Sequence, residues 1–197
     1  LYKQQVLSYL EYRTSAVYHA ADSILAPLDR IQNRILRAVN ISELEALLHF
    51  KLAPLPTRRD IAMLGVVHRS VLGRGPKLLD SLMRRAEPVR NPRTRLAVNR
   101  HRFQLIEECD GAHTDYVTRS LLGAVWVYNL LPPSIVEVAA TVSEFQGMCQ
   151  SLVVECACAG VPNWQHCLSP RIPRHCHPLL AKISSGCVSC CVQGNLL

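Results

Sequence analysis

The first 108 residues of the chain contain no cysteine, and lysine is scarce throughout. All nine cysteines lie between Cys109 and Cys191, and only four of the 22 basic residues are lysines. Without a recognisable secretory leader, nine cysteines do not favour a disulfide-stapled scaffold. The longest run without a charged residue, 120–136, covers 17 residues and contains Pro132 and Pro133. A membrane-spanning helix needs about 20 apolar residues, so we interpret this run as a buried segment and expect no membrane partner.

The usual sequence signatures of catalysis are also absent. Residues 73–77 have the wrong spacing for a phosphate-binding Walker loop, and Pro76 removes a backbone amide that the phosphate would need. The chain has no Gly-x-Ser-x-Gly elbow, no His-Glu-x-x-His motif and no adjacent pair of aspartates. Two-metal nucleotidyl transfer requires carboxylates that converge on one site. We therefore expect this chain to have no catalytic centre, no cofactor and no small-molecule substrate of its own.

The chain does have an uneven distribution of charge. Residues 1–108 contain 18 Lys and Arg against 10 Asp and Glu, a net charge of +8, whereas residues 109–197 contain 4 against 5, a net charge of −1. A predominance of arginine over lysine favours bidentate contact with phosphates. Residues 84–102 contain seven arginines and a single acid, Glu87. We predict that residues 86–111 form a basic linker.

The segment 28–37 predicts a helix with two distinct faces. At 100° per residue, four aliphatic side chains fall within about 80° of one another and are expected to be buried: Leu28, Ile31, Ile35 and Val39. Arg30, Arg34 and Arg37 cluster on the opposite side, within about 60°. Guanidinium groups at this spacing can bind phosphates, although a helix that is simply exposed to solvent has the same pattern.

Apolar periodicity and capping residues predict further helices. The expected ranges are 3–19, 23–39, 43–52, 57–72, 77–85, 114–122 and 142–159. Ser42 with Glu45, and Ser143 with Gln146, have the spacing of capping boxes, and Thr57 is a candidate cap. The predicted fold class is mostly α. It comprises a helical region at 1–85, the basic linker, a smaller helical segment at 112–160 and an irregular tail at 161–197, for which we expect little packed structure.

Histidine and aromatic side chains in this pattern are expected to be structural. His19, His49 and His68 lie in or beside apolar helical segments with no second ligand near them in the sequence, so a core or flanking position is expected for each. Trp126 and Tyr128 are interpreted as core aromatics because the run around them is apolar.

The tail contains the nearest approach to a metal site. Cys187 and Cys190 form a Cys-x-x-Cys pair with Cys191 beside it, but only six residues follow. A structural zinc site needs four ligands, and Cys167, His175, Cys176 or His177 could complete it only at an unfamiliar spacing. No metal ligand is therefore assigned, and a zinc-binding adaptor built on the tail is kept as an alternative.

The candidate functional residues are arginines that could contact a nucleic-acid backbone. They are Arg30, Arg34, Arg37, Arg58, Arg59, Arg84, Arg85, Arg90, Arg93 and Arg95. No motif that reads a nucleic-acid groove accompanies them, so sequence-specific recognition is not expected. On the residues alone, a helical protein-interaction module whose charge keeps it soluble fits as well as a nucleic-acid-binding protein.

An ordered series of motifs resembles the region after the polymerase palm in the reverse transcriptases of non-LTR (LINE-type) retrotransposons. The series begins with Leu-Glu-Tyr at 10–12 and continues with Leu-Asp-Arg-Ile-Gln-Asn-Arg-Ile-Leu-Arg at 28–37. The blocks 52–69 and 128–132, the latter reading Tyr-Asn-Leu-Leu-Pro, follow in the family's order. Phe145 then fits a further family helix, with Gln146 in place of the usual base. The resemblance covers about residues 1–170.

This resemblance implies part of an intracellular RNA-directed DNA polymerase, in the nucleus or the cytoplasm. The chain would be a thumb-like region that holds template RNA or an RNA–DNA hybrid, and its partners would be the palm and fingers of the same polyprotein. The catalytic Asp-Asp motif and its Mg²⁺ would belong to that upstream part, consistent with a chain that begins at Leu1 without an initiator Met. Two features depart from the family: residues 187–191 do not reproduce its zinc knuckle, and 171–197 match none of its motifs.

Overall fold

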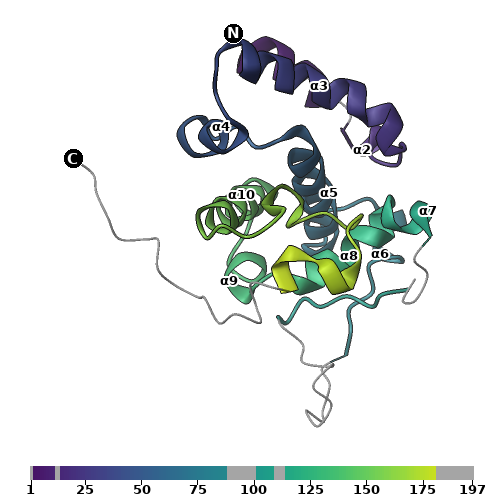
Figure 1. The fold of residues 1–197 in the computed structure, drawn as a ribbon. Helices are drawn as coiled ribbons and strands as arrows, with labels where there is room; N and C mark the ends of the chain where they lie inside the picture. The colour runs from purple at the N-terminus through teal and green to yellow at the C-terminus, as the bar shows by residue number, and fades with distance from the viewer. Residues whose placement is uncertain (1, 12–13, 88–100, 109–113, 181–197) are drawn as a thin grey trace.

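The computed structural model describes residues 2–11, 14–87, 101–108 and 114–180 (Figure 1). The fold is mostly α-helical, as predicted. Its longer helices are α3 (Asp22–Ala38), α4 (Glu43–Phe50), α5 (Leu55–Val71), α8 (Leu121–Leu130) and α10 (Val142–Cys158). The short ones are the π-helical turn η1 (Tyr2–Leu7), α1 (Ser8–Glu11), α2 (Thr14–Val17), α6 (Lys77–Asp80), α7 (Asp115–Thr118), α9 (Pro133–Val136), and the 3₁₀ turns η2 (Trp164–His166) and η3 (Arg174–Cys176).

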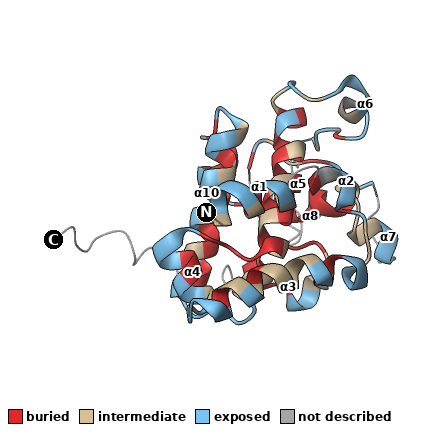
Figure 2. Cartoon of the chain, turned by 90° about the horizontal axis from the view of Figure 1, so that it is seen from above, coloured by how far each residue is buried: buried red, intermediate tan, exposed pale blue. Residues whose placement is uncertain are grey.

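Helix α5 runs through the middle of the molecule and packs against both α8 and α10 (Figures 1 and 2). The main core is built around Val67 of α5, Val127 of α8 and Phe145 of α10, all fully buried. Helix α5 precedes the basic segment and the other two helices follow it, so one core spans both sides of residues 86–111. Part of that segment is itself tied to the core, because the Asn129 side chain accepts from the Leu105 amide and donates to its carbonyl, both at 2.9 Å.

The predicted helix boundaries are partly confirmed. The Ser42–Glu45 capping box is present, and its two bonds from Ser42 hold the pKa of Glu45 below its ordinary value. Helix α5 stops just before Gly73, whose φ of +70° only glycine adopts readily. Thr57, however, does not cap α5: the helix begins at Leu55, since proline is well suited to a first helical turn, and the Thr57 hydroxyl instead donates to the Gln165 carbonyl.

Three other boundaries differ from the prediction. Helix α10 begins at Val142, as predicted, but Thr141 and Glu144 form its capping box in place of Ser143 and Gln146. In the described parts of 3–19, residues 3–11 and 14–19, the structure has three short elements, η1, α1 and α2, and helix α6 ends at Asp80. The segment 114–122 breaks between α7 and α8, where Gly123 lies so close to the backbone of α7 that a Cβ would be 2.3 Å from the Val117 carbonyl oxygen. The chain therefore turns back on itself between the end of α7 and the start of α8, so that Gly123 of α8 packs against the backbone of α7.

The expectation of little packed structure after residue 161 is wrong for residues 161–180. Cys167, Leu168 and Leu179 are buried in the main core. The ring of His177 is also buried and lies edge-on to Trp126, with 4.7 Å between ring centroids. The prolines of this segment end helices without preventing burial of the side chains between them. Residues 181–197 lie outside the described part of the chain.

His68, Trp126 and Tyr128 are core residues, as predicted. The His68 ring stacks on Phe145 at a centroid distance of 4.2 Å, with an angle of 9° between the planes. Nε2 donates to the Ala139 carbonyl at 3.2 Å, which leaves Nδ1 to accept from the Tyr128 hydroxyl at 3.0 Å. Burial lowers the pKa of His68, so the neutral ring is the one that holds α5, α8 and α10 together. His19 and His49 are exposed flanking residues.

A second buried polar cluster joins the N-terminal turns to α5. The Asp60 carboxyl is buried and accepts from the Tyr18 hydroxyl at 2.9 Å. Arg171, from the C-terminal segment, donates to the Tyr18 carbonyl at 2.6 Å and pairs with Asp22 at the start of α3. Burial raises the pKa of Asp60 to about 7. This cluster therefore carries a titratable group that changes charge near neutral pH.

We expect Asp60→Asn to flatten the pH dependence of stability. The folded protein holds a proton on Asp60 that the unfolded chain releases above pH 4, so the wild-type free energy of unfolding falls as pH rises towards 7. Relative to Asp60→Asn, the wild type should lose about 2 kcal/mol between pH 5 and pH 8. Urea denaturation at both pH values measures this difference. Asp115→Asn, at a side chain that is 88% exposed, is the control, and an equal pH dependence in wild type and Asp60→Asn would contradict the assignment.

Tyr128→Phe should destabilise the core by about 1–2 kcal/mol, because it leaves the buried Nδ1 of His68 without a donor. The matched control is Tyr116→Phe, at a tyrosine that is 84% exposed, which should leave stability unchanged. Chemical denaturation of the two variants tests the expectation. Equal stabilities would show that the hydroxyl bond to His68 contributes nothing.

Candidate nucleic-acid interface

Helix α3 presents three arginines on one exposed face. It lies along the outside of the molecule, at the top of Figure 1. Arg30, Arg34 and Arg37 are all exposed, and within the part of the chain that the structure describes none of their side chains forms a hydrogen bond or an ion pair. Their positions at i, i+4 and i+7 place the guanidinium groups in a row along the helix. Three uncompensated charges therefore point into solvent from a rigid element.

The buried side of α3 is not the one predicted from its aliphatic residues. Leu25, Gln32 and Leu36 are buried, whereas Val39 is 55% exposed and the other three predicted residues are half-buried. The side chain of Gln32 donates to the Ala53 carbonyl at 3.1 Å. Because Gln32 contacts Ala53 and Asp29 pairs with Arg59 of α5, the side of α3 that carries these two polar residues faces the body. Helix α3 is therefore rotated about its own axis relative to the prediction, and its arginine face points outward.

Arg58 and Arg59 lie on α5 and make contacts inside the molecule. Arg59 is buried and pairs with Asp29 of α3, at 2.8 Å between Nη1 and Oδ1. Arg58 pairs with Glu11 of α1. Both guanidinium groups therefore hold N-terminal helices on α5, and their charges are compensated. We leave them out of the interface.

Arg84 and Arg85 lie in a separate region of the molecule. Residues 84–87 and 101–106 run antiparallel, with a single bridge between Arg85 and Leu105. The Nε of Arg84 donates to Glu108 at 2.9 Å. Arg85 donates to the Val71 carbonyl at 3.2 Å, and its guanidinium lies 4.9 Å from the centroid of the Phe103 ring. Arg90, Arg93 and Arg95 lie outside the described residues.

The two basic regions are at opposite ends of α5. Arg59, near the start of this helix, contacts α3, whereas Arg85 contacts Val71, its last residue. Seventeen residues at 1.5 Å each separate the two ends by about 25 Å, and Figure 1 shows α3 at one end and residues 84–87 and 101–108 at the other. The structure therefore brings Arg30, Arg34 and Arg37 together and does not add Arg84 and Arg85 to them.

Two lysines near α3 are not among the basic residues that the sequence predicts to be functional. Lys3 of η1 donates to the carbonyl of Phe50 at the end of α4, and Lys51 follows directly. Both are exposed. Each stands alone in its own stretch of sequence, so no periodic pattern could have joined them. Their proximity arises from the packing of η1 across the end of α4.

The described residues contain no cluster of three or more His, Cys, Asp or Glu side chains that could hold a metal ion. Cys187, Cys190 and Cys191 lie outside them. Nor does the described part of the chain include a helix long and apolar enough to cross a membrane.

Comparison of the chain with protein-family models, curated proteins and solved structures gives no match. What the chain binds is therefore inferred from its own residues, above all those of α3.

Proposed function

We propose that this chain is the thumb-like and post-polymerase part of a non-LTR retrotransposon reverse transcriptase, and that α3 binds the backbone of template RNA or of an RNA–DNA hybrid. The observation that carries the proposal is the row of three exposed arginines without a partner among the described residues. The motif series of the sequence supports the family assignment, and the mostly α-helical fold is compatible with it.

The geometry of α3 suits contact with a phosphate backbone. From Arg30 to Arg37 the helix rises about 10 Å, a distance that covers about three phosphates of one strand in a duplex. Arginine forks bind phosphate oxygens bidentately, and release of counterions from the backbone supplies most of the sequence-independent affinity. The half-buried aliphatic residues beneath them and the Asp29–Arg59 pair fix the helix on the body. The arginines would thus meet the ligand on a helix that is already formed.

In this proposal the chain holds the nucleic acid and does not carry out the chemistry. Nucleotidyl transfer and its Mg²⁺ would belong to the palm of the same polyprotein. A Tyr/Phe-x-Asp-Asp motif within a couple of hundred codons upstream in the same reading frame is the simplest test of that assignment. A different upstream domain would contradict it.

Replacing Arg30, Arg34 and Arg37 together with Gln should weaken binding of a labelled RNA–DNA hybrid at least tenfold at 100 mM salt. The plot of log Kd against log salt between 50 and 200 mM should become shallower by about 2–3, because three phosphate contacts are lost. Fluorescence anisotropy measures both quantities.

The control removes the same charge elsewhere, from exposed arginines of the body: Arg69, Arg74 and Arg102. This second triple variant should retain most of the affinity. If both triple variants lost the same affinity for the hybrid, the nucleic acid would be attracted by the net charge of the protein and not bound at a site on α3. Unchanged affinity in the α3 variant would favour the protein-interaction module over a nucleic-acid-binding function.

A further inference from the structure

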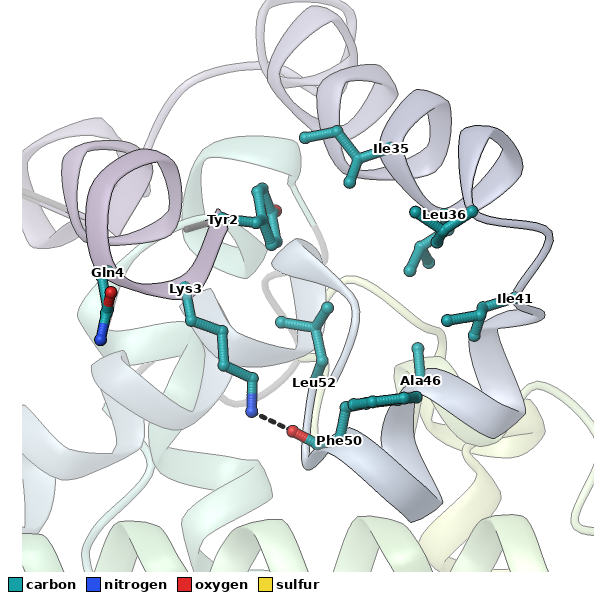
Figure 3. A pocket seen from close by; sticks show the side chains of 10 residues that line it. Tyr2, Lys3, Gln4, Ile35, Leu36, Ile41, Ala46, Phe50 and Leu52 are labelled. Atoms are coloured by element: carbon teal, nitrogen blue, oxygen red, sulfur yellow. Dashed lines mark hydrogen bonds between the residues drawn. The ribbon is translucent and has the colours of Figure 1, made fainter.

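An apolar groove of about 480 Å³ lies on the other side of α3 from the arginines (Figure 3). Side chains from η1, α3 and α4 converge on it, and Figure 3 shows Tyr2, Ile35, Leu36 and Ala46 directed towards the same space. They cover the small second core, which contains only five buried residues. The groove's apolar surface continues outward, because Val39 and Phe50 line it and are 55% and 50% exposed.

Two lysines lie at the edge of this groove. The only charged residue among those that line it is Lys3, and Lys51 lies between the lining residues Phe50 and Leu52. In the described part of the chain neither lysine pairs with a carboxylate. An apolar surface with basic groups at its edge is complementary to a segment that combines apolar and acidic side chains.

Each acid described in residues 2–52 has a hydrogen-bond or ion-pair partner other than Lys3 and Lys51. Three pair with arginines outside residues 2–52: Glu11 with Arg58, Asp22 with Arg171 and Asp29 with Arg59. Glu43 accepts from the Gln165 side chain at 3.4 Å, and Glu45 is held in the capping box of α4. The described residues of this region thus keep their basic charge on both sides of α3.

We propose that the groove binds an acidic amphipathic helix of a protein partner. Apolar side chains of such a helix, spaced at i, i+3 or i+4 and i+7, would fill the space between α3 and α4. Its carboxylates would lie near Lys3 and Lys51 at the rim. A nucleic acid fits this surface less well, because a groove lined by aliphatic and aromatic side chains offers few partners for phosphates or base edges. The site does not depend on the proposed role of the arginine face.

The test is a selection of helical peptides on the complete chain. A displayed library of random 16-residue peptides is selected on the wild-type protein and depleted on the double variant Val39→Glu/Phe50→Glu. Both residues are half exposed, so this variant should fold, and circular dichroism checks that it does. The control, Leu78→Glu/Val138→Glu, adds the same charge at residues that are 79% and 64% exposed and lie outside the groove.

We expect the selected peptides to be rich in acidic residues and to carry apolar residues at helical spacing. The Val39→Glu/Phe50→Glu variant should weaken their binding at least tenfold and the control variant less than twofold. Lys51→Asn, which suits the left-handed backbone at this position (φ +50°), should weaken it severalfold and reduce its salt dependence.

Four outcomes would overturn the proposal. The selected peptides could be neutral or basic, or bind both double variants equally. The groove variant alone could lose affinity for an RNA–DNA hybrid while no peptide depends on the groove, which would assign the groove to nucleic acid. Sedimentation could show a wild-type dimer that the groove variant abolishes, which would assign it to a second copy of the chain.

Discussion

The burial of polar side chains on α5 is the constraint on which the rest of the structure depends. A buried polar group without a partner costs about 1–3 kcal/mol or more, so each must be met by another segment. Thr57 is met by the carbonyl of Gln165 and Asp60 by the hydroxyl of Tyr18. His68 is met by Tyr128 and by the carbonyl of Ala139. Segments packed on a purely apolar helix could slide along it or rotate around it. These hydrogen bonds fix the position of each neighbouring segment along α5.

The orientation of α3 follows from the same constraint. Arg59 is buried near the start of α5, and its partner is Asp29. Asp29 lies close to Gln32 on the helical surface, so the side of α3 that faces the body contains both polar residues. Ile35 and Val39 then come to lie at the edge of the contact, where they line the groove in place of filling a core. The arginines remain outside because they occupy the far side of the same helix.

The sequence predicts the features that depend on neighbouring residues. The helices, the Ser42 cap and the stop at Gly73 all follow from local chemistry. Because the row at Arg30, Arg34 and Arg37 depends only on helical periodicity, it too could be read from the sequence. Its exposure agrees with that pattern.

The features that the sequence could not predict depend on contacts between distant residues. The rotation of α3 is set by Asp29 and Gln32, whose partners are 30 and 21 residues away. The burial of Leu168 and Leu179 occurs in a segment that contains no long helix, so no periodic pattern indicates it. The distance between Arg34 and Arg85 depends on the direction of α5, which only the packed structure defines.

The ion pairs that position the N-terminal helices also determine the electric field around them. Arg58, Arg59 and Arg171 belong to the body, and each takes a carboxylate from residues 2–52. The pairs of Arg58 and Arg59 are partly buried and therefore less screened by salt than a pair on the surface, whereas the Asp22 side chain of the third pair is exposed. The exposed bases of the N-terminal region keep their charge because Glu11, Asp22 and Asp29 pair with arginines of the body and not with them. The contacts that fix the position of α3 thus also leave its outer face positive, and a surface that binds anions needs both properties.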